Sequence, residues 1–327
     1  MKQKIRVLQI RETPETKCGG IDANCQAIFN IFANDTDIEM LPIRDYEVKK
    51  ISFLRSRYIS YKEVYESIKN ESPDIVHIHG SYTFTFMNAI KAARKCGKKI
   101  VYSPHFHPFY SLARPKMGYI FFHLLIKPFL KYVDTIITIN SEDTAWFSKY
   151  HSNVLRIPHW SKLNVLSNKT FKKNPKQILF VGRINDSIKG IEHLYSLPEG
   201  KYEIHCVGKG TLRQRSDITQ HVNISDEELT KLYVESSLLV IPSRYEAFSY
   251  VAVEALSCNT PIVASERVRI TDYFESCPFV GIFRYHDMQD FASKIEQTIG
   301  KEVDLLQVKY IFDSYRLKAI YKNIYLT

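Results

Sequence analysis

Short apolar runs rich in β-branched residues alternate with amphipathic segments along most of the chain, and this alternation restricts the possible folds more than any other feature. Buried runs separated by helical patterns are typical of parallel strands covered by helices on both faces. In the first half we expect helices near 21–33, 61–70, 83–96, 117–132 and 142–150, and strands at Ile5–Ile10, Ile38–Pro42, Ile75–Ile78, Lys99–Ser103, Thr135–Ile139 and Val154–Ile157. The first half therefore predicts an α/β domain with a doubly wound, Rossmann-like parallel sheet.

The alternation stops at residues 158–176, which are polar, lie between Pro158 and Pro175 and are typical of a linker. It then restarts and predicts a second open α/β sheet, followed by one helix from Val308 to Tyr325. We therefore expect residues 1–158 plus the crossing helix near 308–327 as the first domain, and 159–307 as the second. The second half should hold helices near 189–196, 226–235, 250–257 and 287–299, and strands at Ile178–Val181, Glu203–Val207, Leu238–Ile241, Pro261–Ala264 and Phe279–Gly281.

The formal net charge is +10, and residues 1–160 contribute +8 of it. Basic clusters in this half, including Lys91–Lys99 and the aromatic segment 114–132, are typical of contact with an anionic membrane surface. A core helix with a solvated basic face explains them equally well. No nucleic-acid module pattern is present, so we expect no nucleic acid partner.

The apolar run Ile5–Ile10 is too short for the core of a signal peptide, and no 18-residue apolar run occurs. The six cysteines form no C-x-x-C pair and have no zinc-site spacing. We therefore expect a cytoplasmic protein with reduced thiols, with membrane contact limited to the cytoplasmic face.

Glycines follow several of the expected strands. Gly19-Gly20 precede the first helix, where free backbone N–H groups suit an anion, although a plain loop-to-helix turn fits as well. Arg183 and Lys189 follow the strand that ends in FVG, and two cations there would suit a diphosphate, with ordinary surface charge as the alternative. The next strand exit, VGKG, contains Gly208 and Gly210.

The stretch PSRYEAFSYVAVEA carries the most specific pattern. Glu246 lies in a loop and Glu254 lies inside the helix that follows, so both carboxylates can accept hydrogen bonds from vicinal hydroxyls. Small side chains at Ala247 and Ser249 leave the first backbone N–H groups of that helix open to a phosphate.

Together these stretches resemble the motif regions of glycosyltransferase family 4 (group 1), retaining enzymes with the GT-B fold. The family pattern P-S-x-x-E-G-F-G, followed by an E-A pair that sets two glutamates eight positions apart, is similar to residues 242–249 and 254–255 here. The glycine loop, PDIVHIHG, YSPHFHP and FVGR…KG stand in family order. The resemblance implies an acceptor-binding domain followed by a nucleotide-sugar-binding domain, facing a central cleft.

The resemblance also implies residue roles. Arg183 and Lys189 would neutralise the departing diphosphate, Glu246 would hold hydroxyls of the donor sugar, and Glu254 would hold those of the ribose. With His105, the first three form the expected catalytic set. The residues expected to contact phosphate or sugar also include Gly19, Gly20, Gly208, Phe248, Ser249, Tyr250 and Val251.

His105 is expected beside the donor sugar, with His107 as the competing assignment because HFH allows two alignments. His79 is expected to pack at a strand end. Ala247, Ser249 and Asn259 stand where the family has glycine.

The expected activity is transfer of a sugar, with retention, from a nucleoside-diphosphate sugar to a glycan or lipid-linked acceptor in surface or lipid-linked glycan assembly. The D-x-D sequence of this chain, Asp35-Thr36-Asp37, lies outside the motif regions, so we expect neither a required metal nor a cofactor. Two alternatives stay open: a non-catalytic sugar-nucleotide-binding subunit, and another GT-B enzyme such as a sugar-nucleotide epimerase or a phosphorylase.

Overall fold

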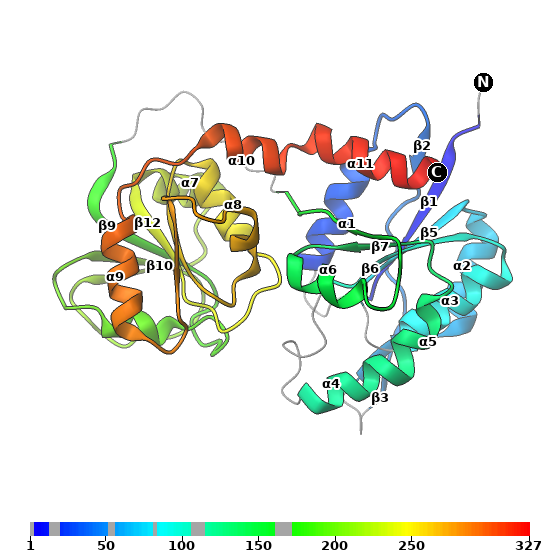
Figure 1. Ribbon diagram of the computed structural model, residues 1–327, viewed down its shortest axis with the longest axis horizontal. Helices are drawn as coiled ribbons and strands as arrows, with labels where there is room; N and C mark the ends of the chain where they lie inside the picture. The colour runs from blue at the N-terminus through cyan, green and yellow to red at the C-terminus, as the bar shows by residue number, and fades with distance from the viewer. Residues whose placement is uncertain (1–2, 13–19, 52–55, 81–83, 106–114, 161–171) are drawn as a thin grey trace. The chain divides into compact units, whose positions relative to one another are not determined.

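The computed structural model describes residues 3–12, 20–51, 56–80, 84–105, 115–160 and 172–327. The chain divides into two compact units, which Figure 1 shows with their elements labelled: unit 1 is Met1–Trp160 with Asp313–Thr327, and unit 2 is Ser161–Phe312. The sequence put these divisions after residue 158 and near residue 308. None of the helices in the described ranges has both the length and the apolar character that crossing a bilayer requires.

Unit 1 is built on a six-stranded parallel sheet of order β2-β1-β5-β6-β7-β8. A separate antiparallel pair, β3 and β4, precedes β5. The strands are β1 (Ile5–Ile10), β2 (Ile38–Met40), β3 (Val48–Ile51), β4 (Ser56–Ile59), β5 (Ile75–His79), β6 (Lys99–Ser103), β7 (Thr135–Thr138) and β8 (Val154–Arg156). The helices are α1 (Gly20–Ile31), α2 (Tyr61–Glu71), α3 (Phe84–Lys95), α4 (Pro115–Phe121), the π-helix η2 (Phe122–Ile126), α5 (Lys127–Leu130), α6 (Ser141–Phe147) and α11 (Ser314–Leu326).

The two faces of this sheet differ in chemistry because successive side chains of a strand point to opposite sides. On one face, Ile10 and Ile78 join an apolar core with α2 and α3. On the other face, Gln9 donates to the carbonyl of Cys25 in α1, and its neighbour in register, His77, contacts Tyr325 of α11. Figure 1 shows α11 beside α1, although these helices lie almost 300 positions apart in the chain. The polar residues of the sheet therefore lie beneath these two helices.

Charged groups hold α11 on unit 1. Lys318 and Lys322 contact the buried carboxylate of Asp35 at 2.9 and 3.2 Å. Burial acts to raise the pKa of Asp35, but the backbone N–H of Asp37 and the two ammonium groups outweigh it and hold that pKa well below its usual range. Asp35 is therefore ionised at neutral pH and fixes the helix by charge-assisted hydrogen bonds.

Unit 2 contains a second six-stranded parallel sheet, of order β11-β10-β9-β12-β13-β14. Numbered along the unit this order is 3-2-1-4-5-6, the arrangement of doubly wound Rossmann sheets. The strands are β9 (Asn174–Val181), β10 (Glu203–Val207), β11 (Ile218–His221), β12 (Ser236–Ile241), β13 (Ile262–Ser265) and β14 (Val280–Phe283). The helices are η3 (Ile191–Ser196), α7 (Asp226–Glu235), α8 (Tyr250–Ser257), η4 (Arg269–Tyr273), α9 (Met288–Thr298) and α10 (Leu305–Phe312).

The two predicted parallel sheets are confirmed, and the differences from the sequence prediction have local causes. The sequence did not predict the pair β3–β4 or the strand β11. For β11 the reason is that the β10–β11 connection has no helical pattern to separate a new strand from the one before it. The predicted helix 308–325 is wrong as a single element: Asp313 interrupts it and caps α11 by accepting a hydrogen bond from the N–H of Arg316. β9 begins at Asn174, inside the predicted linker.

Candidate functional site

The predicted donor-binding residues of unit 2 lie at the carboxyl ends of β9 and β12. These two strands are neighbours in the sheet, and the strand order reverses between them. Open α/β sheets bind ligands at such a switch point, outside the carboxyl ends of the strands. Arg183 and Lys189 follow β9, whereas Glu246 and Ser249 follow β12.

Lys189 and Glu246 form the central ion pair of this edge. The Lys189 Nζ lies 2.7 Å from Glu246 Oε1, and the two side chains are 24% and 10% exposed. The Ser243 hydroxyl donates to the same carboxylate oxygen at 2.6 Å. Backbone hydrogen bonds join Glu246 to Arg267 and Arg269, so the carboxylate has a fixed position.

Arg183 is held less firmly. Its side chain is 78% exposed, and its guanidinium contacts Asp186 at 2.6 Å, three residues along the same loop. An exposed pair of this kind contributes little to stability, so Arg183 can exchange Asp186 for another anion at small cost.

Two glycines allow the loops of this edge to approach each other. Gly190 has φ +66°, and a Cβ atom there would lie 1.9 Å from the carbonyl oxygen of Pro242. Gly208 has φ +151°, and a Cβ atom there would lie 1.9 Å from the carbonyl oxygen of Gly182. Because such distances are far inside contact range, any side chain at either position would push the loops apart.

The amino end of α8 has features expected of an anion site. Ser249, the residue before its first turn, is 1% exposed and makes no side-chain cap. Its hydroxyl has no hydrogen-bond partner among the described residues. The first N–H groups of a helix lack intrahelical partners, so this end presents donors without an internal acceptor. Phe248, Tyr250 and Val251 are each half-buried around it.

Glu254 lies one turn further into α8 and accepts a hydrogen bond from the Tyr233 hydroxyl of α7 at 2.9 Å. Burial and the adjacent Glu254 carboxylate raise the pKa of Tyr233 well above its usual value, so Tyr233 remains a donor. One oxygen of Glu254 is therefore engaged within unit 2, and the carboxylate has further capacity to accept hydroxyls.

Unit 1 carries a row of histidines at the carboxyl ends of its strands. His79 Nδ1 lies 3.0 Å from His105 Nε2, and the rings of His77 and His79 are 3.9 Å apart between centroids. The ring of His159, which follows β8, lies 5.1 Å from that of His105. His105 itself has φ +58°, a left-handed conformation that is strained in a non-glycine residue.

These rings are neutral at physiological pH. Burial lowers the pKa of His105 to about 3, and burial, with a smaller contribution from His105, lowers the pKa of His77 to about 3. Burial also places the pKa values of His79 and His159 well below the usual value. The rings therefore act as hydrogen-bonding groups and carry no charge.

Two predicted residues, Gly19 and His107, lie outside the described residues. Gly20 begins α1, and Ile21 of the same turn packs where a Cβ atom of Gly80 would be, at 2.7 Å. The sequence assigned no role to His159 or to Arg11, whose Nε lies 2.7 Å from Asp22. Arg11 directly follows β1, and this position after a strand is the one sequence feature that could have indicated a role for it.

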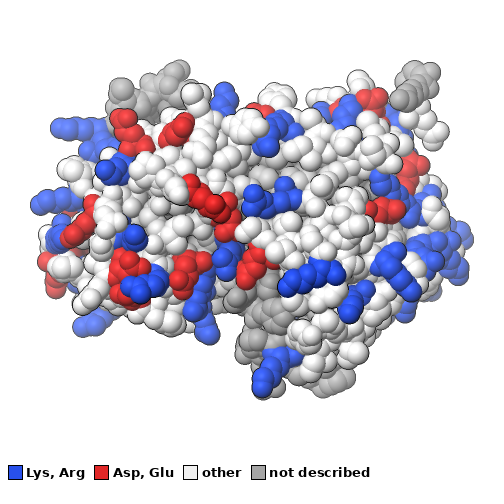
Figure 2. All heavy atoms as spheres, viewed as in Figure 1, with Lys and Arg blue, Asp and Glu red and all other residues white. Residues whose placement is uncertain are grey.

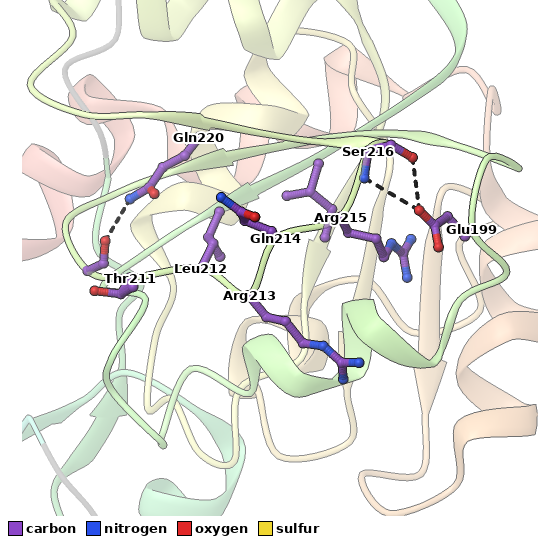
Figure 3. Close-up of a pocket in the computed structure, with 10 residues that line it drawn as sticks. Glu199, Thr211, Leu212, Arg213, Gln214, Arg215, Ser216 and Gln220 are labelled. Carbon is purple, nitrogen blue, oxygen red and sulfur yellow. Dashed lines mark hydrogen bonds between the residues drawn. The ribbon is translucent and has the colours of Figure 1, made fainter.

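A cavity of about 720 Å³ in unit 2 is lined by the segment that follows β10, and Figure 3 shows its side chains. It extends from Gly210, near the carboxyl end of β10, to Ser216 and Glu199, near the amino ends of β11 and β10. None of the predicted donor-binding residues lines it. The cavity therefore lies along the side of the sheet that the helix-free connection leaves open, and it is not the candidate site.

Comparison with known families matches both halves of the chain. The family described as "Glycosyltransferase Family 4" matches residues 34–160, and the family described as "Glycosyl transferases group 1" matches residues 175–301. A 41.2 kDa protein in the cps region of Klebsiella pneumoniae is 25% identical over 243 residues, 66% of each chain. The match thus spans less than two thirds of that relative.

Solved structures match over almost the full length. Anabaena HepE, solved with UDP and glucose, has a TM-score of 0.71 at 13% identity, with 98% of this chain and 99% of that chain covered. The lipopolysaccharide outer core galactosyltransferase WaaB, in its apo form, has a TM-score of 0.69 at 18% identity, with 98% and 100% covered. At these identities the likeness establishes the fold.

Proposed function

The chain belongs to the group 1 glycosyltransferases with the GT-B fold, and on that premise we propose that it transfers a sugar, with retention, from a nucleoside-diphosphate sugar to a glycan or lipid-linked acceptor. The observation that carries this proposal is the Lys189–Glu246 pair at the switch point of the second sheet. It combines, on neighbouring strands, a cation suited to a diphosphate with a carboxylate suited to sugar hydroxyls.

Departure of the nucleotide develops negative charge on the β-phosphate. Arg183 and Lys189 are cations that would stabilise this charge, with the N–H groups at the start of α8 as further donors. The buried, unpartnered hydroxyl of Ser249 supports a polar ligand at this helix end. Glu254 would accept the ribose hydroxyls, and Gly208 would keep backbone accessible near them.

His105 would contact the donor sugar from unit 1. Because its ring is neutral, it would act by hydrogen bonding and not by charge. No carboxylate is available beside it among its described hydrogen-bond and ring partners, which are His79 and His159. A displacement on the same face of the sugar, within an ion pair, fits this environment better than a covalent glycosyl–enzyme intermediate.

The reaction should need no metal, because Arg183 and Lys189 would neutralise the diphosphate. Retention and metal independence are both tested by a transfer reaction run with and without a chelator, followed by NMR of the product. A product with inverted anomeric configuration would refute retention. Loss of activity with chelator, restored by a divalent cation, would refute metal independence.

A thermal-shift screen with nucleotide sugars tests donor binding, and UDP-glucose is the first probe because HepE has been solved with UDP and glucose. A ligand present at 100 times its Kd stabilises the folded state by about 2.7 kcal/mol. Glu246→Ala should reduce the shift given by UDP-glucose to that given by UDP, while leaving the shift with UDP nearly unchanged.

The products formed from a sugar nucleotide distinguish this proposal from its alternatives. A non-catalytic sugar-nucleotide-binding subunit would give the thermal shift without releasing UDP. An epimerase would return a changed sugar nucleotide, whereas a transferase releases the nucleoside diphosphate.

We further propose that unit 1 contacts anionic membrane where a lipid-linked or surface-glycan acceptor is presented. Figure 2 shows Lys and Arg side chains gathered over the part of unit 1 where α2 and α3 lie. Lys91 and Arg94 of α3 lie over the rings of Phe129 and Tyr132, at 5.6 and 3.7 Å. The neighbouring segment α4–η2 exposes Tyr119, Ile120 and Leu124, the last by 66%.

Exposed apolar groups beside cations are the composition of an interfacial segment. The test is flotation with vesicles of anionic or zwitterionic lipid. Binding to anionic vesicles that falls with added salt and with Leu124→Ser supports the proposal. Equal recovery with both lipids, or with neither, would contradict it.

A further inference from the structure

Two buried ring nitrogens of unit 1, His79 Nε2 and His105 Nδ1, have no hydrogen-bond partner among the described residues. The other nitrogens of the same two rings, His79 Nδ1 and His105 Nε2, face each other at 3.0 Å. Burial lowers the pKa of both rings, so each is neutral. A neutral imidazole has one N–H donor and one bare acceptor nitrogen.

The shared contact holds a single hydrogen, so the two rings cannot choose their tautomers independently. If His79 donates from Nδ1, then His105 carries its own hydrogen on Nδ1 and offers a donor to its surroundings. If His105 donates from Nε2, its Nδ1 is a bare acceptor. In either case the state of His79 decides whether the outer nitrogen of His105 donates or accepts.

His79 is the more firmly held of the two. It ends β5, which is bonded to β1 on one side and β6 on the other, and it is 1% exposed. Its ring lies against that of His77, tilted by 35°, and His77 is itself fixed by Ser103 at 2.8 Å and Tyr325 at 2.9 Å. His105 instead lies two residues beyond the end of β6, in a strained backbone conformation.

We propose that His79 is a positioning residue, which orients the His105 ring and fixes the hydrogen-bonding role that His105 Nδ1 presents to a hydroxyl of the bound sugar. The nature of that ligand rests on the proposed function. The coupling between the two rings does not, because it is a property of the protein without ligand.

The first test is NMR of the ring nitrogens in ligand-free, 15N-histidine-labelled protein. In the wild type, His105 should show one tautomer, with a 15N–15N coupling across the hydrogen bond to His79. His79→Leu should give His105 shifts averaged between the two tautomers. His79→Asn, whose amide can occupy the position of Nδ1, should restore a single tautomer.

His77→Leu is the matched control, because it removes a neighbouring buried ring from the same strand. It should lower the melting temperature by releasing Tyr325 while leaving the His105 tautomer unchanged. The proposal is overturned if His79→Leu keeps the wild-type tautomer, or if His77→Leu alters it equally. Absence of the coupling from a wild-type spectrum that resolves both rings would also overturn it, whether or not the variants fold.

The second test uses hydrolysis of UDP-glucose. His79→Leu should lower kcat by about tenfold, the effect of one misplaced hydrogen bond, with little change in KM, and His79→Asn should recover most of the loss. An equal rise in KM without change in kcat would contradict a positioning role. If the wild type hydrolyses no sugar nucleotide, the proposed function fails while the tautomer result still stands.

Discussion

The two sheets of this protein present chemically opposite edges, although both are parallel and doubly wound. At the edge of unit 1 the functional candidates are neutral, buried histidine rings in contact with one another. At the edge of unit 2 they are charged groups, Lys189 with Glu246 and Arg183 with Asp186. Two parallel sheets therefore differ in what they present: one edge presents hydrogen-bonding groups, and the other presents charge.

The difference also lies in what holds each edge together. In unit 2 the loops approach through backbone contacts that require glycine at positions 190 and 208. In unit 1 the edge is held by side chains, with His77 bonded to β6 and to α11. We therefore expect the two edges to respond differently to substitution and to pH.

The largest loss of kcat/KM should follow removal of a charged side chain from the site in unit 2. Lys189→Ala should lower kcat/KM for a nucleotide sugar by roughly 1,000-fold, because it removes a fixed cation and leaves the Glu246 carboxylate unpaired. His105→Ala in unit 1 should have a smaller effect, about 100-fold, since it removes a neutral hydrogen-bonding group. Steady-state kinetics with one donor checks both values.

Lys201→Ala is the control for Lys189→Ala, because Lys201 pairs with Glu296 on the surface of the same unit. It should leave the kinetics unchanged. If His105→Ala proves the more damaging of the two site variants, the division of tasks between the edges is wrong.

Replacing a glycine with alanine, which adds one methyl group, tests the close backbone contacts of unit 2. Gly190→Ala should lower the free energy of unfolding of this unit by roughly 3 kcal/mol, because the new Cβ meets the Pro242 carbonyl oxygen. Gly200→Ala, also at positive φ but with nothing within 4 Å of the new Cβ, should lower it by about 1 kcal/mol, the strain alone. Urea unfolding of the two variants measures the difference, and equal values would show that the Gly190 contact relaxes freely.

Lowering the pH should reduce the free energy of unfolding of unit 1 more than that of unit 2. Folding lowers the pKa of His77 and His105 from about 6.5 to about 3, so the unfolded chain binds protons first as the pH falls. The stability that these neutral rings allow is fully present above pH 6.5 and is lost as the pH falls from there towards 3. The loss approaches about 1.4 kcal/mol per pH unit for one ring.

Amide hydrogen exchange at pH 7 and pH 5, corrected for intrinsic rates, should show protection lost in β5 and β6 before β9 and β12. His77→Leu should flatten this pH dependence, whereas His151→Gln, at a residue that is part-exposed in the same unit, should not. Uniform loss of protection across both sheets would contradict the assignment to unit 1.

Much of the fold could be predicted because buried strands are continuous apolar runs. Ile5–Ile10, Lys99–Ser103 and Glu203–Val207 have the predicted bounds. The strand β11 could not be predicted, because ITQH contains one strongly apolar residue and follows a connection without a helix. Its place depends on the Arg215–Asp217 ion pair, in which Arg215 also donates to the carbonyls of Leu194 and Leu197.

The site residues could be selected from the sequence, but their partners could not. FVGR…KG and PSRYEAFS indicate a cation and a carboxylate, but the approach of Lys189 to Glu246 depends on how two distant loops pack. Likewise, HIH in PDIVHIHG does not reveal that His77 bonds to Tyr325, 248 residues away, or that His79 bonds to His105.

The return of α11 to unit 1 has a consequence for synthesis of the chain. On the polar face of the first sheet, His77 gains its partner Tyr325 only when residues 313–327 have been translated. All of unit 2 is made in the interval, which at ordinary elongation rates lasts about 10 to 30 seconds. The unit encoded first is therefore completed last, and its incomplete sheet is a natural client for a chaperone during that time.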